Sequence, residues 1–234
     1  MNQHISVYIK IVFLFVLLSL PLSFFGQDKR PFVVVLDAGH GGHDPGAKGR
    51  FSEEKDINLA VTFLVGDKIK ENDPDTKIIY TRDRDIFVPL KRRAEIANEA
   101  QADLFISIHT NAATNRLASG TETYTLGIGK NDQHMDVAIR ENAVILYEDD
   151  YKENYGGFDP NSIESYIIFE FMQDKNMDQS INFASMLQDG FAFEAQRIDR
   201  GVRQAGFLVL RNTTMPSVLV ELGYISNTVE EKYL

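Results

Sequence analysis

From Pro31 onward, short apolar runs alternate with segments of helical periodicity, a pattern typical of an α/β domain. Apolar runs rich in β-branched residues predict strands over residues 32–37, 77–81, 103–109, 121–126, 207–210 and 217–221. Apolar residues at helical spacing predict helices over residues 54–72, 89–100, 135–147 and 177–194. A chain of 234 residues is long enough to bury the core of one such domain.

The first 26 residues differ from the rest of the chain. A run without charge, Ile11 to Phe25, follows Lys10. It is short for a membrane span but matches the apolar core of a signal peptide. Phe24 stands where a small residue is preferred before a cut after Gly26. We therefore expect an exported protein in which residues 1–26 are a signal peptide, with an uncleaved membrane anchor as the alternative.

Composition excludes several classes of site. The chain has no cysteine, which rules out disulfides, thiolate metal sites and a cysteine nucleophile. Its formal net charge of −10 argues against binding to nucleic acid. Any metal ion must therefore be held by histidine, aspartate or glutamate.

Three residues with metal-binding side chains fall at corresponding points of the predicted sheet. His40 follows the first strand, His109 ends the third strand, and Glu54 opens the first helix. Strand ends of an open α/β sheet converge at one crevice, so the three side chains can meet there. They would form a His₂Glu set that leaves one zinc position for water. The alternative to a metal site is that the histidines only make hydrogen bonds and that Glu54 only stabilises the start of the helix.

The segment around His40, DAGHGGHDPGAKG, is rich in glycine. A phosphate-binding loop would need a Gly-Lys-Ser/Thr ending or a third glycine in the dinucleotide register, and neither is present. We expect the glycines to let the backbone fold closely around His40. His43 lies deeper in this loop and His134 in a polar stretch, so both are weaker candidates for a ligand.

Glu221 directly follows the apolar run 218–220. A carboxylate at the end of a buried strand is costly unless it pairs, binds or reacts. A zinc hydrolase needs one carboxylate that is not a ligand and that takes a proton from water. An ion pair with an arginine is the structural alternative, and position alone leaves both open.

Four separated segments then agree in order with one family. They are LDAGHGGHDPGAKG, EKDINLAV, PLKRRAEIANEAQADLFISIHTNAA and RGVRQAGFLVLRNTTMPSVLVELGYISN, within residues 33–231. The chain thereby resembles the zinc-dependent N-acetylmuramoyl-L-alanine amidases of type 3. The resemblance implies an α/β fold with a mixed, mostly parallel sheet flanked by helices, similar to zinc exopeptidases of the phosphorylase/hydrolase-like fold. It also implies that residues 31–234 form the catalytic domain.

The resemblance assigns roles to residues. It implies one Zn²⁺ per chain held by His40, Glu54 and His109, with Glu221 as the catalytic base and then acid. The implied substrate is peptidoglycan, cut between N-acetylmuramic acid and L-alanine during wall remodelling or daughter-cell separation. The implied location is the periplasm or cell envelope of a bacterium.

Three polar residues near these motifs receive weaker assignments. We expect Asp37 to orient His40, and Asn111 and Arg203 to contact substrate. Polar residues beside a metal can also be merely structural.

Two other classes of protein compete with the amidase. A zinc carboxypeptidase acting on wall peptides would use a similar metal set and should have an arginine-bearing pocket for a terminal carboxylate. A non-catalytic wall-binding or activator protein would have lost the metal-binding residues, which this chain retains.

Residues of about 128–176 interrupt the alternation and are interpreted as an insertion. Its central part, 148–164, is acidic. We expect the segment 142–165 to cap the metal site until an activator protein binds, with Glu148 and Glu153 as the carboxylates that reach the metal. A solvated surface loop is the equally weighted alternative. The chain stops at Leu234 inside a starting helix where similar domains continue, so a truncated C-terminal helix is expected.

Overall fold

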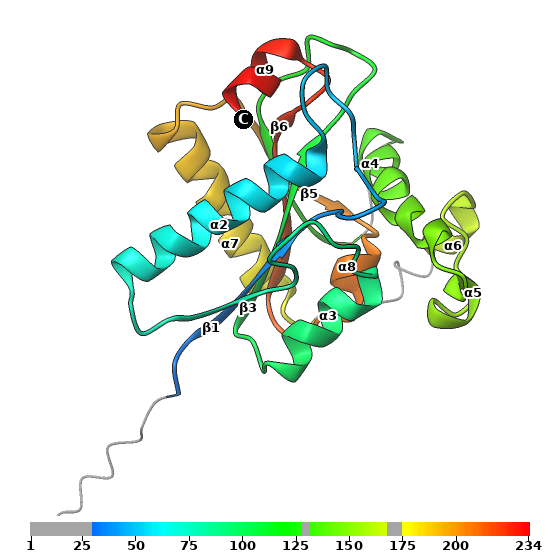
Figure 1. Cartoon of the computed structure of the whole chain (residues 1–234), viewed down its shortest axis with the longest axis horizontal. Helices are drawn as coiled ribbons and strands as arrows, with labels where there is room; N and C mark the ends of the chain where they lie inside the picture. Colours follow the sequence, from blue (N-terminus) through cyan, green and yellow to red (C-terminus); the bar gives the residue numbers. More distant parts are fainter. Residues whose placement is uncertain (1–29, 128–131, 168–174) are drawn as a thin grey trace, which may run out of the picture. The chain divides into compact units, whose positions relative to one another are not determined.

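The computed structural model describes residues 30–127, 132–167 and 175–234 (Figure 1). Residues Pro31–Leu234 form one compact unit. Its centre is a six-stranded sheet of order β2-β1-β3-β6-β4-β5. The strands are β1 (Val33–Ala38), β2 (Lys77–Tyr80), β3 (Leu104–Asn111), β4 (Thr121–Leu126), β5 (Asp199–Ala205) and β6 (Ser217–Tyr224). The expected signal segment, 1–26, lies outside the described residues.

The sheet is mixed and mostly parallel, as the family resemblance implied. Strands β2, β1, β3 and β6 run parallel, β4 is antiparallel to β6, and β5 is parallel to β4. Strand β1 shows why the central strands are apolar on both sides. Val33 and Val35 pack into the core on one face, whereas Val34 and Leu36 pack into the core on the other.

Helices cover both faces of the sheet (Figure 1). On one face lie α2 (Glu54–Asn72) and α7 (Met177–Asp189), whose apolar residues join the smaller core cluster. On the other face the larger cluster includes residues of α3 (Leu90–Glu99), α4 (Asp132–Asn142), the 3₁₀ turn η1 (Ala143–Tyr147), α6 (Ile163–Ile167) and α8 (Leu208–Arg211). The remaining elements are α5 (Tyr151–Asn154), the π turn η3 (Gly190–Glu194) and α9 (Thr228–Tyr233). Within the described ranges, no helix combines the length and apolar character that crossing a membrane requires.

The expected strand over residues 207–210 is wrong. Leu208–Arg211 is the short helix α8, and the strand of this region is β5, Asp199–Ala205. Periodicity cannot separate a buried strand from a buried helical turn in so short an apolar run. Strand β5 was not predicted from the sequence because most of its residues are polar and it lies at the edge of the sheet, beside β4.

Two predicted helices are interrupted. The helix expected over 135–147 is α4 followed by η1, and the helix expected over 177–194 changes at Gly190 into η3. Of the expected insertion, the described parts are α4, η1, α5 and α6, which pack beside α3 and α8 through the larger core cluster.

Candidate active site

The loop after β1 is built to bring its backbone close to metal-binding side chains. His40 has a φ of +62° and Gly46 a φ of +64°, in the left-handed region that favours glycine. A Cβ at Gly39 would come within 2.4 Å of the ring of His109, and one at Gly46 within 2.6 Å of Cδ2 of His40. The prediction of close folding around His40 is confirmed for Gly46, whereas Gly39 permits the close approach of His109.

The structure brings His40, Glu54 and His109 together. Oε1 of Glu54 lies 3.2 Å from Nε2 of His40 and 3.2 Å from Nδ1 of His109. The centroids of the two imidazole rings are 5.0 Å apart. All three side chains are buried. Because they come from the ends of β1 and β3 and the start of α2, the fold places them at one edge of the sheet.

A fourth side chain, Glu141 near the end of α4, enters the same cluster. Its Oε2 lies 3.0 Å from Nε2 of His40 and 3.0 Å from Nδ1 of His109. One ligand atom from each of the four residues lies within 4.8 Å of every other. Sequence reasoning passed over Glu141. Its signal was a glutamate four positions after Val137 and three after Ala138, two buried residues on the apolar face of the helix.

The donor set fits a metal ion. Although Nε2 of His40 and Oε2 of Glu141 are close, neither atom has a hydrogen-bond partner among the described residues. Buried polar atoms that converge without bonding to each other point at a common centre. Two imidazole nitrogens and two carboxylates are ligands that zinc accepts.

Neighbouring groups hold the ligands in place. Asp44 Oδ2 lies 2.7 Å from Nδ1 of His40, which orients that ring. The backbone N–H of Thr110 donates to Oε1 of Glu54 at 2.9 Å, and that of Ala47 donates to Oε2 at 2.8 Å. The carboxylate of Glu54 is therefore fixed from both sides.

The electrostatics of the cluster favour positive charge at its centre. Burial alone would lower the pKa of His109, but the carboxylates of Glu141 and Glu54 raise it to about 9. Burial likewise opposes charge on His40, yet Glu54, Asp44 and Glu141 raise its pKa well above the ordinary value. A divalent cation meets the same negative field.

Glu221 lies beside the cluster but is not part of it. It pairs with His109 of β3 on one side and with Glu122 of β4 on the other. Its side chain is fully buried, and neither oxygen has a hydrogen-bond partner in the described parts of the chain. Burial, together with the charges of Glu141 and Glu54, raises its pKa well above the ordinary value. A carboxylate in this state can hold a proton.

Asp37 makes no hydrogen bond with the imidazole of His40 in the structure. Its carboxylate accepts hydrogen bonds from Ser107 at 2.6 Å and from Arg93 at 2.7 Å. The residue that orients His40 is Asp44, four positions further along the loop. The expected role of Asp37 is therefore corrected: the buried Asp37–Arg93 pair supports the backbone under the loop, since Arg93 also donates to the carbonyl of His40 at 2.9 Å.

The acidic residues expected to cap the metal lie elsewhere. Glu148 accepts a hydrogen bond from the hydroxyl of Tyr155 at 2.8 Å, and Glu153 is exposed on α5. Neither belongs to the four-residue cluster. The carboxylate that joins the cluster is instead that of Glu141, which immediately precedes the segment 142–165. His43 is also outside the cluster and stacks on Phe87 with ring centroids 4.3 Å apart. The side chain of His134 is not among those described.

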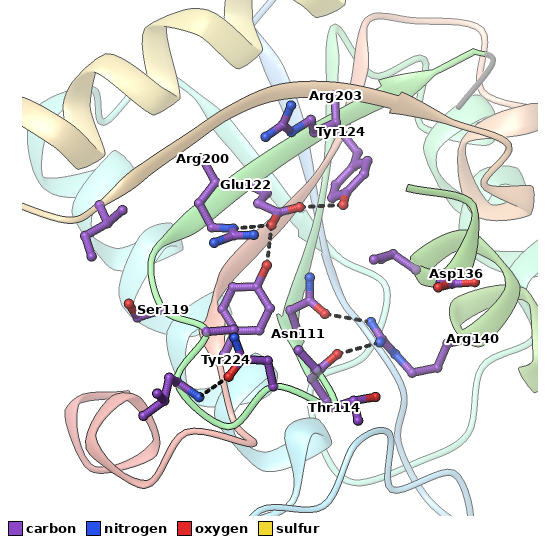
Figure 2. Close-up of a pocket in the computed structure, with 17 residues that line it drawn as sticks. Asn111, Thr114, Ser119, Glu122, Tyr124, Asp136, Arg140, Arg200, Arg203 and Tyr224 are labelled. Carbon is purple, nitrogen blue, oxygen red and sulfur yellow. Dashed lines mark hydrogen bonds and ion pairs between the residues drawn. The ribbon is translucent and has the colours of Figure 1, made fainter. Parts of the chain in front are cut away.

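A pocket of about 570 Å³ is lined by residues of β4, β5 and α4 (Figure 2). It lies next to Glu221, because the lining residue Glu122 pairs with Glu221 across β4 and β6. Both residues expected to contact substrate, Asn111 and Arg203, line it. Oδ1 of Asn111 accepts a hydrogen bond from Arg140 at 3.0 Å, and Arg140 also lies 3.9 Å from Oε1 of Glu221. Arg140 therefore links the lining of this pocket to the buried carboxylate of Glu221.

Comparisons with known proteins agree with this arrangement. The family model described as N-acetylmuramoyl-L-alanine amidase matches residues 34–234. The chain is 34% identical to the N-acetylmuramoyl-L-alanine amidase AmiC of Escherichia coli O6:H1 over 89% of its length, and it spans 49% of that relative.

Two solved structures share the fold. The crystal structure of an N-acetylmuramoyl-L-alanine amidase from Clostridium difficile 630 has a TM-score of 0.63 and 27% identity, covering 87% of this chain and 85% of that one. The CwlD amidase of Clostridioides difficile, solved in complex with the GerS lipoprotein, has a TM-score of 0.52 and 25% identity, covering 86% of each chain. The chain therefore belongs to the N-acetylmuramoyl-L-alanine amidase family.

Proposed function

We propose that this protein hydrolyses the amide bond between N-acetylmuramic acid and L-alanine of peptidoglycan, with zinc as its metal. The observation that carries the proposal is the buried cluster of His40, Glu54 and His109 beside Glu221, whose buried carboxylate accepts no hydrogen bond in the described parts of the chain. Family membership supports the substrate class. Residues 31–234 act as the catalytic domain in this proposal, with the insertion at about 128–176 as its regulatory part.

His40, Glu54 and His109 would hold one Zn²⁺. When bound, zinc supplies an acidified water and polarises the amide carbonyl. The buried ligands and the fixed carboxylate of Glu54 keep the donor set in one geometry, since its two oxygens are already bound by Thr110 and Ala47. Little reorganisation is then needed when substrate arrives.

Glu221 is the proposed general base and general acid. One of its carboxylate oxygens takes a proton from the attacking water and then delivers it to the departing nitrogen of L-alanine. Its raised pKa suits both steps, because a carboxyl that binds a proton readily can also carry it to the leaving group.

In this proposal the structure represents an inactive state of the enzyme, because Glu141 belongs to the metal-binding cluster. A catalytic zinc site keeps one position open for water, and a fourth protein ligand closes it. Glu141 provides that ligand from α4, so the helix must move before water and substrate can enter. CwlD, a solved relative, forms a complex with a lipoprotein. We propose that a partner protein likewise binds this chain and displaces α4, which would couple activity to the place where the wall is cut.

The proposed site of action is the periplasm or another part of the bacterial cell envelope, since the substrate lies there. Residues 1–26 would direct export, as a signal peptide or as an uncleaved anchor. Cell-wall remodelling or daughter-cell separation is the process that such an enzyme serves.

One observation favours a second function. The pocket beside Glu221 contains Arg140, Arg200 and Arg203, and a zinc carboxypeptidase needs an arginine for a terminal carboxylate. The two reactions leave different products. The amidase leaves glycan without peptides and new α-amino groups on L-alanine, whereas the carboxypeptidase releases single amino acids from the peptide end.

Digestion of purified peptidoglycan with the zinc-loaded Glu141→Ala protein separates the two reactions. We expect new N-terminal L-alanine, detected by dinitrophenylation, and its loss after treatment with chelator. Release of free amino acids without new N-terminal alanine would overturn the amidase assignment. Cleavage that persists in metal-free protein would overturn the role of the metal.

A further inference from the structure

The pocket beside Glu221 has an arginine-bearing wall that is created by a bulge. The pairing of β4 with β5 shifts register between Thr121 and Thr123, so that Thr121 pairs with Asp199 but Thr123 pairs with Val202. Gly201, with a φ of +90°, supplies the backbone conformation in the extra stretch. In a regular strand, residues three positions apart point to opposite faces. Because of the bulge, Arg200 and Arg203 both line the same pocket (Figure 2).

Most charges in the pocket already have partners. Glu122 accepts hydrogen bonds from Nε of Arg200 at 2.6 Å, from the hydroxyl of Tyr124 at 2.5 Å and from the hydroxyl of Tyr224. Burial opposes ionisation of Glu122, but these donors hold its pKa below the ordinary value. The only other acidic residue of the lining, Asp136, is exposed.

Arg140 is also occupied. It donates to the carbonyl of Ala112 at 2.9 Å and to Asn111 at 3.0 Å, and it pairs with Glu141 at 3.1 Å. The third arginine, Arg203, differs. Its side chain makes no hydrogen bond or ion pair with any residue that the structure describes, and its Nε is buried without a partner. A guanidinium left in this state inside a pocket is a binding group for an anion.

We propose that Arg203 binds the α-carboxylate of the second residue of the stem peptide, and that the pocket thereby selects peptides in which this group is ionised. The inference rests on the proposed function, since it assigns this pocket to the peptide side of the scissile amide. In peptidoglycan the second residue is D-glutamate linked through its γ-carboxyl, so its α-carboxylate is free or, in some walls, amidated.

The spacing of the strands agrees with this assignment. β6, β4 and β5 are neighbours, and Arg203 pairs with Tyr124, which pairs with Leu219, two residues from Glu221. Two strand spacings and two residues along the strand, roughly 12 Å, therefore separate the backbone at Glu221 from that at Arg203. An arginine side chain covers part of that span. One extended residue advances a peptide by about 3.5 Å. A carboxylate on the residue after L-alanine can therefore reach Arg203. In a carboxypeptidase substrate, the carboxylate belongs to the same residue as the nitrogen of the cleaved bond. That carboxylate would lie closer to Glu221 than to Arg203.

The direct test is binding, without turnover, of the leaving peptide. Two synthetic probes, L-Ala-γ-D-Glu-L-Lys-amide and its D-isoglutamine analogue, differ only in whether the α-carboxyl is free or amidated. Isothermal titration calorimetry on metal-free protein should show the carboxylate probe binding at least about 10-fold more tightly, the effect of one charge-assisted pair. Arg203→Gln should abolish this difference, and Arg203→Lys should restore part of it.

Arg92→Gln is the matched control. Arg92 lies on α3, away from the pocket, and pairs with Glu99. This variant should retain the wild-type preference. Equal binding of the two probes to the wild type, no binding of either, or a preference that survives in a folded Arg203→Gln protein would overturn the inference. Because binding is measured without zinc, its result is independent of whether the loaded enzyme cuts peptidoglycan, and the two proposals fail separately.

Discussion

Oε2 of Glu141 lies 3.0 Å from Nε2 of His40, and neither atom bonds to the other. In the proposed function, this carboxylate closes the position that a catalytic zinc site leaves open. Glu141→Ala should therefore raise the rate of peptidoglycan hydrolysis without a partner, by roughly 5–150-fold for a coupling of ordinary size. The measurement is release of N-terminal L-alanine from purified wall.

Glu148→Ala is the control for this variant. Glu148 is bonded to Tyr155 and is not part of the cluster, so its removal should leave the basal rate near that of the wild type. If Glu141→Ala is folded, binds zinc and is no faster than the wild type, Glu141 does not restrain the enzyme.

Glu221→Gln tests whether Glu221 acts as the general base or as a metal ligand. Glutamine keeps the shape of the side chain but cannot accept a proton, so the rate should fall by at least ~10². Zinc stoichiometry, measured by elemental analysis, should stay at the wild-type value, because Glu221 is not among the four clustered residues. Loss of zinc in this variant would make Glu221 a ligand and require another base.

Substitution of the histidines tests the metal site itself. His40→Ala or His109→Ala should remove tight zinc binding and activity together, since each supplies a nitrogen to the cluster. His43→Ala should keep the metal, because His43 stacks on Phe87 instead. Dialysis against chelator, followed by calorimetric titration with Zn²⁺, measures the affinity. Unchanged zinc affinity in both cluster variants would refute the site.

The buried pair of Asp37 and Arg93 predicts a pH-dependent loss of stability. Burial by itself raises the pKa of Asp37, but Arg93 and the hydroxyls around it hold that pKa below the ordinary value. In Arg93→Met the carboxylate stays buried without its counter-charge, so the free energy of unfolding at neutral pH should fall by about 3–5 kcal/mol. Denaturant unfolding measures this change.

The sign of the pH effect follows from the two pKa shifts. The wild type gains stability from Asp37 above its ordinary pKa and loses that gain as pH falls through the lower folded value. In Arg93→Met the folded pKa is raised, so protonation relieves the buried charge. The deficit relative to the wild type should narrow as pH falls from 7 to about 4. Arg92→Met on the same helix removes an exposed pair and should show little change. A deficit that widens on acidification would contradict this account.

Much of the fold could be predicted because its signals are local. The buried strands β1, β3 and β6 each contain a run of mostly apolar residues, and α2 begins and ends where its apolar spacing indicates. The segment 207–210 could not be predicted, because a strand and a helical turn bury four apolar residues equally well. Strand β5 could not either, since its polar residues become a strand only through pairing with β4.

The sequence by itself determined which kinds of side chain stand at the site. Motifs at strand ends carry His40, His109 and Glu221, and parallel strands bring such ends together whatever the rest of the chain does. The tertiary structure alone decided which carboxylate completes the cluster. Glu141, Glu148 and Glu153 are similar as residues of an acidic, partly helical region, and only the packing of α4 against the sheet directs Glu141 inward. The same holds for Arg203, which faces the pocket because a bulge in β5 turns it there. Contacts between distant segments set these orientations, and local sequence does not encode them.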